Sequence, residues 1–111
     1  YFYERRMPMK VAKNYYTGDS IKNKERIVKR LIKNYLYKDI YCLCLEPSSE
    51  YLMVIIKTNE MKNNISRYRD CKVVGIARNK EEAFELTRRI IDDVYKKYKD
   101  PMMIKEFFAW E

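Results

Sequence analysis

The sequence contains no histidine and only two glycines among its 111 residues. The absence of histidine removes the commonest general base, the Ser-His and Cys-His nucleophile pairs, and most zinc and iron sites. Two glycines, Gly18 and Gly75, cannot build the glycine-rich loops that hold nucleotide phosphates, which excludes a P-loop and a Rossmann dinucleotide site. We therefore expect a protein that is not an enzyme and that binds no cofactor and no metal.

The sequence also lacks long apolar runs and a disulfide framework. No apolar run approaches the roughly 20 residues that span a bilayer, and no signal-peptide pattern opens the chain. The three cysteines, Cys42, Cys44 and Cys71, are an odd number at no disulfide-forming spacing, so we expect reduced thiols and a cytoplasmic location. Three thiolates fall short of the four ligands of a closed zinc site, and small core residues are the favoured interpretation.

Length and composition predict one folded domain. Hydrophobic residues make up 47% of the chain and charged residues 36%, so we expect one core with well-solvated outer faces. We assign residues 1–18 to a basic and aromatic N-terminal arm, in which residues 1–6 are either native or foreign to the fold. Residues 19–111 form the domain. The abundance of Lys, Asn, Ile and Tyr, which AT-rich codons encode, indicates a bacterial source of low GC content.

Two amphipathic helices are predicted from apolar residues spaced three and four apart. The first spans residues 20–36 and follows a turn in which Asp19 or Ser20 supplies the N-cap. The second spans residues 80–98 and has Asn79 as its N-cap. Acidic residues begin this second helix and lysines end it, which is the arrangement that the helix dipole favours.

Four strands are predicted from apolar, β-favouring runs that are separated by turn signals. They span residues 40–45, 51–56, 71–77 and 102–110. Gly75 in the third run indicates a bulge or a close backbone approach. The order α-β-β-β-α-β predicts a small α+β domain, with a mostly antiparallel sheet of three to five strands packed on one face by the two helices.

The positive charge is concentrated in the first third of the chain. The net charge is +8, and residues 1–40 hold 11 Lys and Arg against four Asp and Glu. The other 71 residues hold 13 against 12, so they are almost neutral. A local basic field of this kind attracts phosphates or anionic lipid, which makes nucleic acid a candidate partner.

Basic side chains cluster on the side of the first helix that lies opposite its apolar face. With two arginines of the arm they form a candidate anion or nucleic-acid face: Lys22, Arg26, Lys29, Arg30, Lys33, Arg5 and Arg6. Tyrosines of the arm, such as Tyr15 and Tyr16, are candidates for stacking on the bases of a single strand. The alternative is a solvated surface without a ligand, which charge runs usually are.

The C-terminal segment is unusually apolar for one terminal strand, because it has apolar side chains on both faces. It supplies a candidate interaction surface: Met102, Ile104, Phe107, Phe108 and Trp110. Pairing with a second copy or with another protein would bury these side chains. The leading hypothesis is therefore a non-catalytic binding or regulatory module that acts through protein contacts, with nucleic-acid binding as the alternative.

Overall fold

The computed structural model describes residues 10–32, 40–46, 53–63 and 71–109, and within these ranges the chain forms one four-stranded sheet and four α-helices. The strands are β1 (Lys10–Thr17), β2 (Tyr41–Leu45), β3 (Val54–Lys57) and β4 (Lys72–Ala77). The helices are α1 (Lys24–Ile32), α2 (Thr58–Asn63), α4 (Lys80–Tyr98) and α5 (Ile104–Ala109), with the 3-10 turn η2 (Pro101–Met103) before α5. The predicted α+β class and the predicted helix at 80–98 are confirmed.

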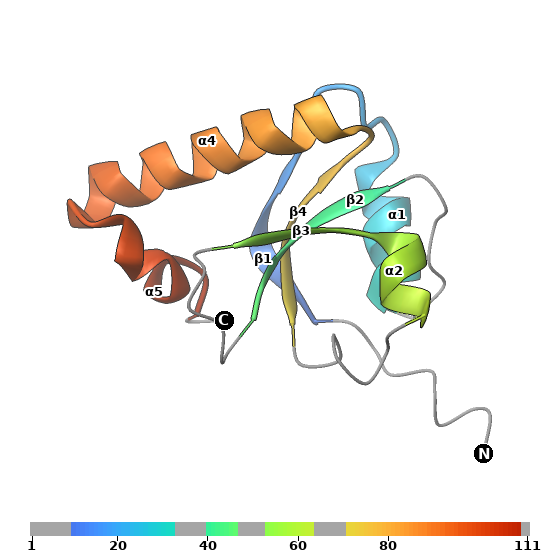
Figure 1. The fold of residues 1–111 in the computed structure, drawn as a ribbon, viewed down its shortest axis with the longest axis horizontal. Coiled ribbons are helices and arrows are strands. Elements are labelled where there is room, and N and C mark those ends of the chain that lie inside the picture. Colours follow the sequence, from blue (N-terminus) through green and yellow to red (C-terminus); the bar gives the residue numbers. More distant parts are fainter. Residues whose placement is uncertain (1–9, 33–39, 47–52, 64–70, 110–111) are drawn as a thin grey trace, which may run out of the picture.

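The sheet is mixed, with the strand order β1-β4-β2-β3 (Figure 1). β2 pairs antiparallel with β3 and with β4, whereas β1 lies parallel to β4 at one edge. Two of the three pairings are thus antiparallel, in agreement with the prediction. Residues 10–17 lie in the predicted arm, yet they form β1 and belong to the sheet.

Different helices cover the two faces of the sheet (Figure 1). On one face, Val28 and Leu31 of α1 pack against the strands in a cluster that we call the α1-side core. On the other face, Ile90 of α4 and Phe108 of α5 pack in the α4-side core. The prediction that both helices lie on one face is therefore wrong. The physical reason is that β2 is apolar at every position and must be covered on both sides.

The cysteines lie in the α1-side core. Cys42 and Cys44 point to the same face of β2, as residues two apart on a strand do, and Cys71 packs beside them just before β4. All three are buried, and none of them forms a disulfide bond. Burial raises the pKa of the Cys42 thiol to about 12. Burial also raises the pKa of Cys44, and the neighbouring Cys42, Cys71 and Glu46 raise it further. The interpretation of the cysteines as small core residues is confirmed.

Gly75 marks an irregularity in the sheet, as predicted. β2 and β4 pair Leu43 with Gly75 but Cys44 with Val73, so β4 has one more residue than its partner at this point. The extra residue shifts the alternation of β4, and Val73 and Ile76, three residues apart, both face the α1-side core. A Cβ at Gly75 would lie 3.4 Å from Cβ of Leu43, which is ordinary contact. A side chain at position 75 would thus not clash with Leu43, and the bulge is what distinguishes this part of β4.

The predicted strand at 102–110 is wrong, because its described part is helical. The side chain of Asp100 accepts a hydrogen bond from the backbone N of Met102 at 3.0 Å, and Pro101 follows as the first residue of η2. α5 continues from there, and Ile104 and Phe108 are its fully buried side chains. Residues four apart share one face of a helix as readily as one face of a strand, so the apolar pattern fits both structures.

α1 begins later than predicted. Its first described residue is Lys24, and the backbone N of Ile27 donates to the backbone O of Asn23 at 3.1 Å. Asn23, rather than Asp19 or Ser20, therefore stands at the cap position. Residues 33–36, the predicted end of this helix, lie outside the described residues.

α4 ends at a strained residue. Its C-cap, Lys99, has a φ of 63°, the only positive φ of a non-glycine residue among those described, and its backbone N donates to the backbone O of Tyr95. Glycine adopts this left-handed conformation at less cost than other residues. We expect Lys99→Gly to raise the free energy of unfolding by about 0.5–1 kcal/mol in urea denaturation, whereas Lys99→Ala, which keeps a Cβ, should not.

Candidate functional site

The exposed side of α1 carries the basic residues that the sequence singled out. Ile27, Val28 and Leu31 turn towards the sheet, because they lie three and four apart on the helix. The opposite side is exposed to solvent. We define the basic face as the four exposed residues there that the structure describes: Lys22, Arg26, Lys29 and Arg30. The helical periodicity of the sequence therefore predicted correctly that these four side chains lie opposite the buried side of α1.

Three cations of the basic face have no partner among the residues that the structure describes. No side-chain hydrogen bond or ion pair joins Lys22, Arg26 or Lys29 to any other residue that the structure describes. Arg26 lies three residues before Lys29 and four before Arg30, so like charges are neighbours on the helix surface. Each such pair destabilises a helix by a few tenths of a kcal/mol. The stability of α1 therefore does not favour this arrangement.

The two helices differ strongly in charge, although both are amphipathic. Residues 20–32 contain five Lys and Arg and one Glu, a net charge of +4. α4 contains five Lys and Arg and five Asp and Glu, so its net charge is zero. In α4, Arg88 forms ion pairs with Glu85 and Asp92 of its own helix. Of these two helices, α1 is thus the basic one.

A hydrogen-bonded clamp joins the segment before α1 to the start of α4. The carboxylate of Glu82 accepts bonds from the backbone N of Ser20 at 2.9 Å, from Ser20 Oγ at 2.8 Å and from the backbone N of Arg78 at 2.9 Å. We call these bonds the Glu82 clamp. Gly18 lies against it, and a Cβ there would come within 2.1 Å of Cδ of Glu82. The clamp fixes the chain two residues before Lys22, the first residue of the basic face.

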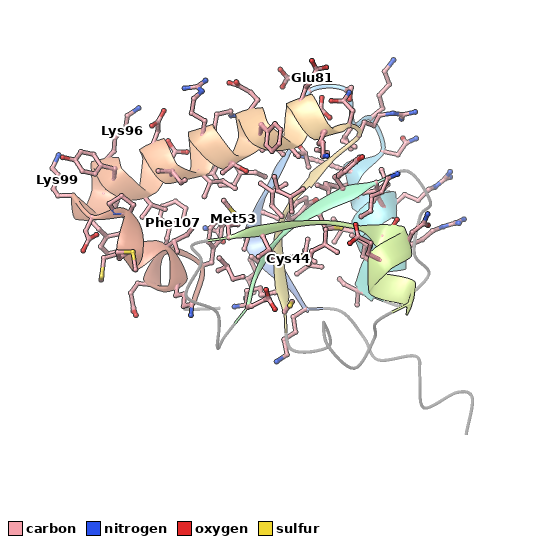
Figure 2. All side chains as sticks on the ribbon, in the orientation of Figure 1. Cys44, Met53, Glu81, Lys96, Lys99 and Phe107 are labelled. Carbon is pink, nitrogen blue, oxygen red and sulfur yellow. The ribbon has the colours of Figure 1, made fainter. Side chains whose placement is uncertain are left out.

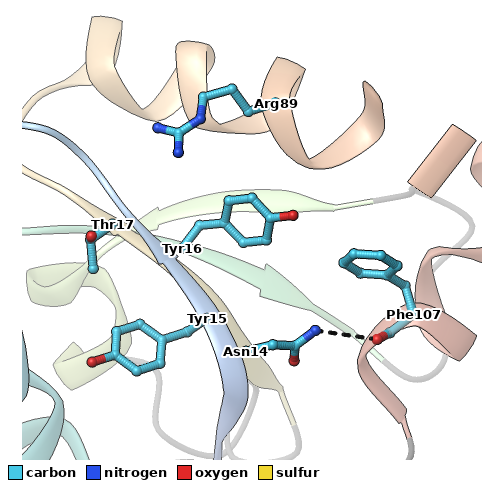
Figure 3. Close-up of a pocket in the computed structure, with 6 residues that line it drawn as sticks. All are labelled: Asn14, Tyr15, Tyr16, Thr17, Arg89 and Phe107. Atoms are coloured by element: carbon cyan, nitrogen blue, oxygen red, sulfur yellow. Dashed lines mark hydrogen bonds between the residues drawn. The ribbon is translucent and has the colours of Figure 1, made fainter. Parts of the chain in front are cut away.

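The predicted anion face also included other basic residues and, beside it, the tyrosines of the arm. Arg5, Arg6 and Lys33 lie outside the described residues. Tyr15 and Tyr16, expected to stack on bases, are half-buried and lie on opposite sides of β1 (Figure 3). Tyr15 packs against the α1-side core and Tyr16 against the α4-side core, so both rings are largely engaged within the domain.

The predicted C-terminal interaction surface is largely core. Ile104 is 1% exposed and Phe108 is 0% exposed, so both belong to the α4-side core and not to a contact surface. Phe107 is half-buried beside them. Met102 is 65% exposed. Trp110 lies outside the described residues. The large apolar content of this segment is therefore explained by packing of α5 on the sheet.

A hollow that the sequence did not predict lies at the edge strand β1 (Figure 3). It has a volume of about 360 Å³, and its lining comes from β1, α4 and α5: Asn14, Tyr15, Tyr16, Thr17, Arg89 and Phe107. β1 pairs Val11 with Val73 but Tyr16 with Gly75, so it carries additional residues that bulge from the sheet. Bulges of this kind redirect side chains at sheet edges. Nothing in the sequence predicts that Arg89 lines this hollow.

Internal contacts hold the Tyr16 hydroxyl and the Asn14 amide nitrogen of this hollow, whereas Asn14 Oδ1 is buried without a hydrogen-bond partner among the described residues. Tyr16 donates a hydrogen bond to Asp93, and the guanidinium of Arg89 lies 5.9 Å from the centre of the Tyr16 ring. Asn14 Nδ2 donates to the backbone O of Phe107 at 3.4 Å. Burial, with the bond to Asp93, raises the pKa of Tyr16 well above its usual range despite the opposing charge of Arg89. Tyr16 therefore stays protonated near neutral pH and is not a ready general base.

Searches for similar proteins leave the basic face without a precedent. No family model matches the sequence, no curated protein matches it, and no solved structure matches the fold. Within residues 10–32, 40–46, 53–63 and 71–109, no group of three His, Cys, Asp or Glu side chains is arranged to hold a metal ion. No helix in those ranges is long and apolar enough to cross a membrane. The case for a function therefore rests on the surface of the domain.

Proposed function

We propose that this protein binds nucleic acid through the basic face of α1. The observation that carries the proposal is the set of exposed cations, Lys22, Arg26 and Lys29, without a partner among the described side chains. Lysine and arginine side chains that neutralise phosphates release condensed counterions, and this release supplies most of the sequence-independent affinity for nucleic acid. An exposed helix with adjacent cations and one acidic residue suits this role.

The buried side of α1 supports the same role. Ile27, Val28 and Leu31 anchor the helix on the sheet, and the Glu82 clamp holds the chain at its start. The backbone of α1 is therefore held on its buried side by the sheet and before its first turn by the Glu82 clamp. Phosphate contacts made from a fixed helix cost less conformational entropy than contacts made from a free arm. The hypothesis that the sequence placed first, a protein contact surface at residues 102–110, has lost Ile104 and Phe108 to the core.

The proposal is tested by charge reversal on α1. We expect Arg26→Glu/Lys29→Glu to weaken binding to labelled double- or single-stranded oligonucleotides by about tenfold or more, measured by fluorescence anisotropy at several salt concentrations. For the unmodified protein, we expect a plot of the logarithm of the association constant against the logarithm of the salt concentration to have a slope of about −3 to −4. This slope applies if all four cations contact phosphates of a duplex. Neutral Arg26→Ala should reduce that slope by about one.

A control with the same change of net charge separates the basic face from the general field of the protein. Lys80→Glu/Lys97→Glu alters two exposed residues of α4, on the other side of the sheet. We expect a much smaller loss of affinity for this control. Equal loss in the two double variants would show that only the overall charge matters, and would contradict the proposal. An absence of binding at low salt would also contradict it.

A further inference from the structure

α4 has an exposed apolar line that neither core uses. Phe84 is 57% exposed and Tyr95 is 52% exposed. They are 11 residues apart, about three helical turns, so they lie within about 20° of each other around the helix axis. Ile91, half-buried, continues the line between them. Single exposed apolar side chains are normal on a protein surface, so this line alone does not identify a partner.

The charges beside this line follow a definite order along α4. Going from its start, the exposed charged residues on that side are Glu81, Glu85, Arg88, Asp92 and Lys96, and the exposed C-cap Lys99 follows the end of the helix. Figure 2 shows Glu81 at one end of α4, with Lys96 and Lys99 at the other. If the helix is turned end to end, each of these charges lies at the same height along the helix axis as a charge of opposite sign in the original orientation. The helix is thus complementary in charge to a reversed copy of itself.

We propose that this side of α4 binds the α4 of a second copy of the chain, with the two helices antiparallel. Placing Phe84 level with the partner's Tyr95 sets the register. Glu85 then lies level with the partner's Lys96, to within about one helical turn. Two-fold symmetry makes each contact twice, which is the usual geometry of a homodimer.

The helix dipole does not account for the charges at the centre of α4, where Arg88 and Asp92 form an ion pair within the helix and also agree with the antiparallel pairing. The dipole favours acidic residues in the first turn and basic residues in the last, and so it accounts for Glu81 and Lys96 without a partner. It makes no demand on Arg88 and Asp92 in the middle of α4. In the antiparallel register Arg88 lies level with the partner's Asp92. Arg88 already forms an ion pair with Asp92 of its own helix, so its charge is compensated when the contact excludes water.

The proposal is tested with a charge swap on the full chain, followed by sedimentation velocity over a wide range of protein concentrations. Glu85→Lys places a lysine against the partner's Lys96, and Lys96→Glu places a glutamate against the partner's Glu85. We expect each variant alone to dimerise about tenfold or more weakly than the unmodified protein. An equal mixture of the two variants restores opposite charges at both contacts, so a heterodimer should form.

The control pair is Glu25→Lys and Lys24→Glu on α1, which lies on the other face of the sheet. Both should dimerise as the unmodified protein does. Three results would overturn the proposal: a monomer at every concentration, unchanged dimerisation of the two α4 variants, or a mixture that fails to restore the dimer. A monomer would leave this side of α4 to a different protein. None of these results bears on the binding of nucleic acid by α1.

Discussion

Phe108→Ala is expected to lower the free energy of unfolding by about 3–5 kcal/mol, because it removes a fully buried aromatic side chain from the α4-side core. Phe108 contacts two other rings edge to face. Its ring centre lies 6.2 Å from that of Tyr16 and 5.0 Å from that of Phe107. Such pairs add to the stabilisation from burial alone. Urea denaturation, monitored by circular dichroism, measures the loss.

Met102 supplies the matched control in the same segment. It is 65% exposed, and Met102→Ala should change the free energy of unfolding by no more than about 0.5 kcal/mol. If both variants have the same small effect, α5 does not pack on the sheet as described. If Phe108→Ala changes self-association and leaves stability intact, the segment is a contact surface after all, as its sequence suggested.

Gly18→Ala is expected to destabilise the protein by about 1–3 kcal/mol, although Gly18 does not have a positive φ. The new Cβ would occupy the position of the Glu82 carboxyl group, 2.1 Å from its Cδ. Glu82 can swing away, because its side chain is flexible, but it then loses its hydrogen bonds to Ser20 and Arg78. The cost is therefore the loss of the clamp and not an irreparable clash.

A double-mutant cycle tests this explanation. Glu82→Ala loses the clamp directly and should cost a similar amount, while it leaves room for a methyl group at Gly18. We therefore expect Gly18→Ala/Glu82→Ala to be little less stable than either single variant, with a coupling of about 1–2 kcal/mol. Strictly additive effects would show that the alanine at position 18 is harmful for another reason.

The same clamp predicts a dependence of stability on pH. Burial acts to raise the pKa of Glu82, but the hydrogen bonds from Arg78 and Ser20, with the charge of Arg78, outweigh it and hold the pKa below 4.5. A carboxylate whose pKa is lowered by folding stabilises the native state above its unfolded pKa and loses that contribution as the pH falls through its folded pKa. The stability difference between the unmodified protein and Glu82→Ala should thus be constant near neutral pH and shrink below about pH 4.5. An undiminished difference at pH 3 would contradict it.

The sequence predicts α4 well, because local signals agree there. Asn79 caps the helix, and its side chain accepts from the backbone N of Glu82 at 2.8 Å. The carboxylate of Glu82, at the position of a capping box, bonds instead to Ser20, which is 62 residues away in sequence. Nothing in the sequence around Glu82 or around Ser20 predicts this contact. Contacts between distant segments depend on how the elements pack around the sheet, and the periodicity of the sequence does not predict that packing.

The candidate site was predictable only in part, for the same reason. The exposure of Arg26 and Lys29 follows from helix geometry once the apolar residues of α1 are known. Their lack of partners among the described residues depends on which elements lie nearby, so only the structure establishes it. Ile104 and Phe108 show the opposite case, since a spacing of four fits one face of a helix and one face of a strand, and length and capping at Asp100 decide the outcome.

The parallel pairing of β1 with β4 has a consequence for how the chain is made. β1 precedes the other described strands, but the one described strand that it pairs with, β4, follows α1, β2, β3 and α2. During synthesis β1 therefore emerges long before β4 exists, and the intervening chain must close as a large loop before the two can pair. β2, β3 and β4 meet through shorter connections. Among the described strands, β1 therefore waits through the synthesis of all the others before its partner exists.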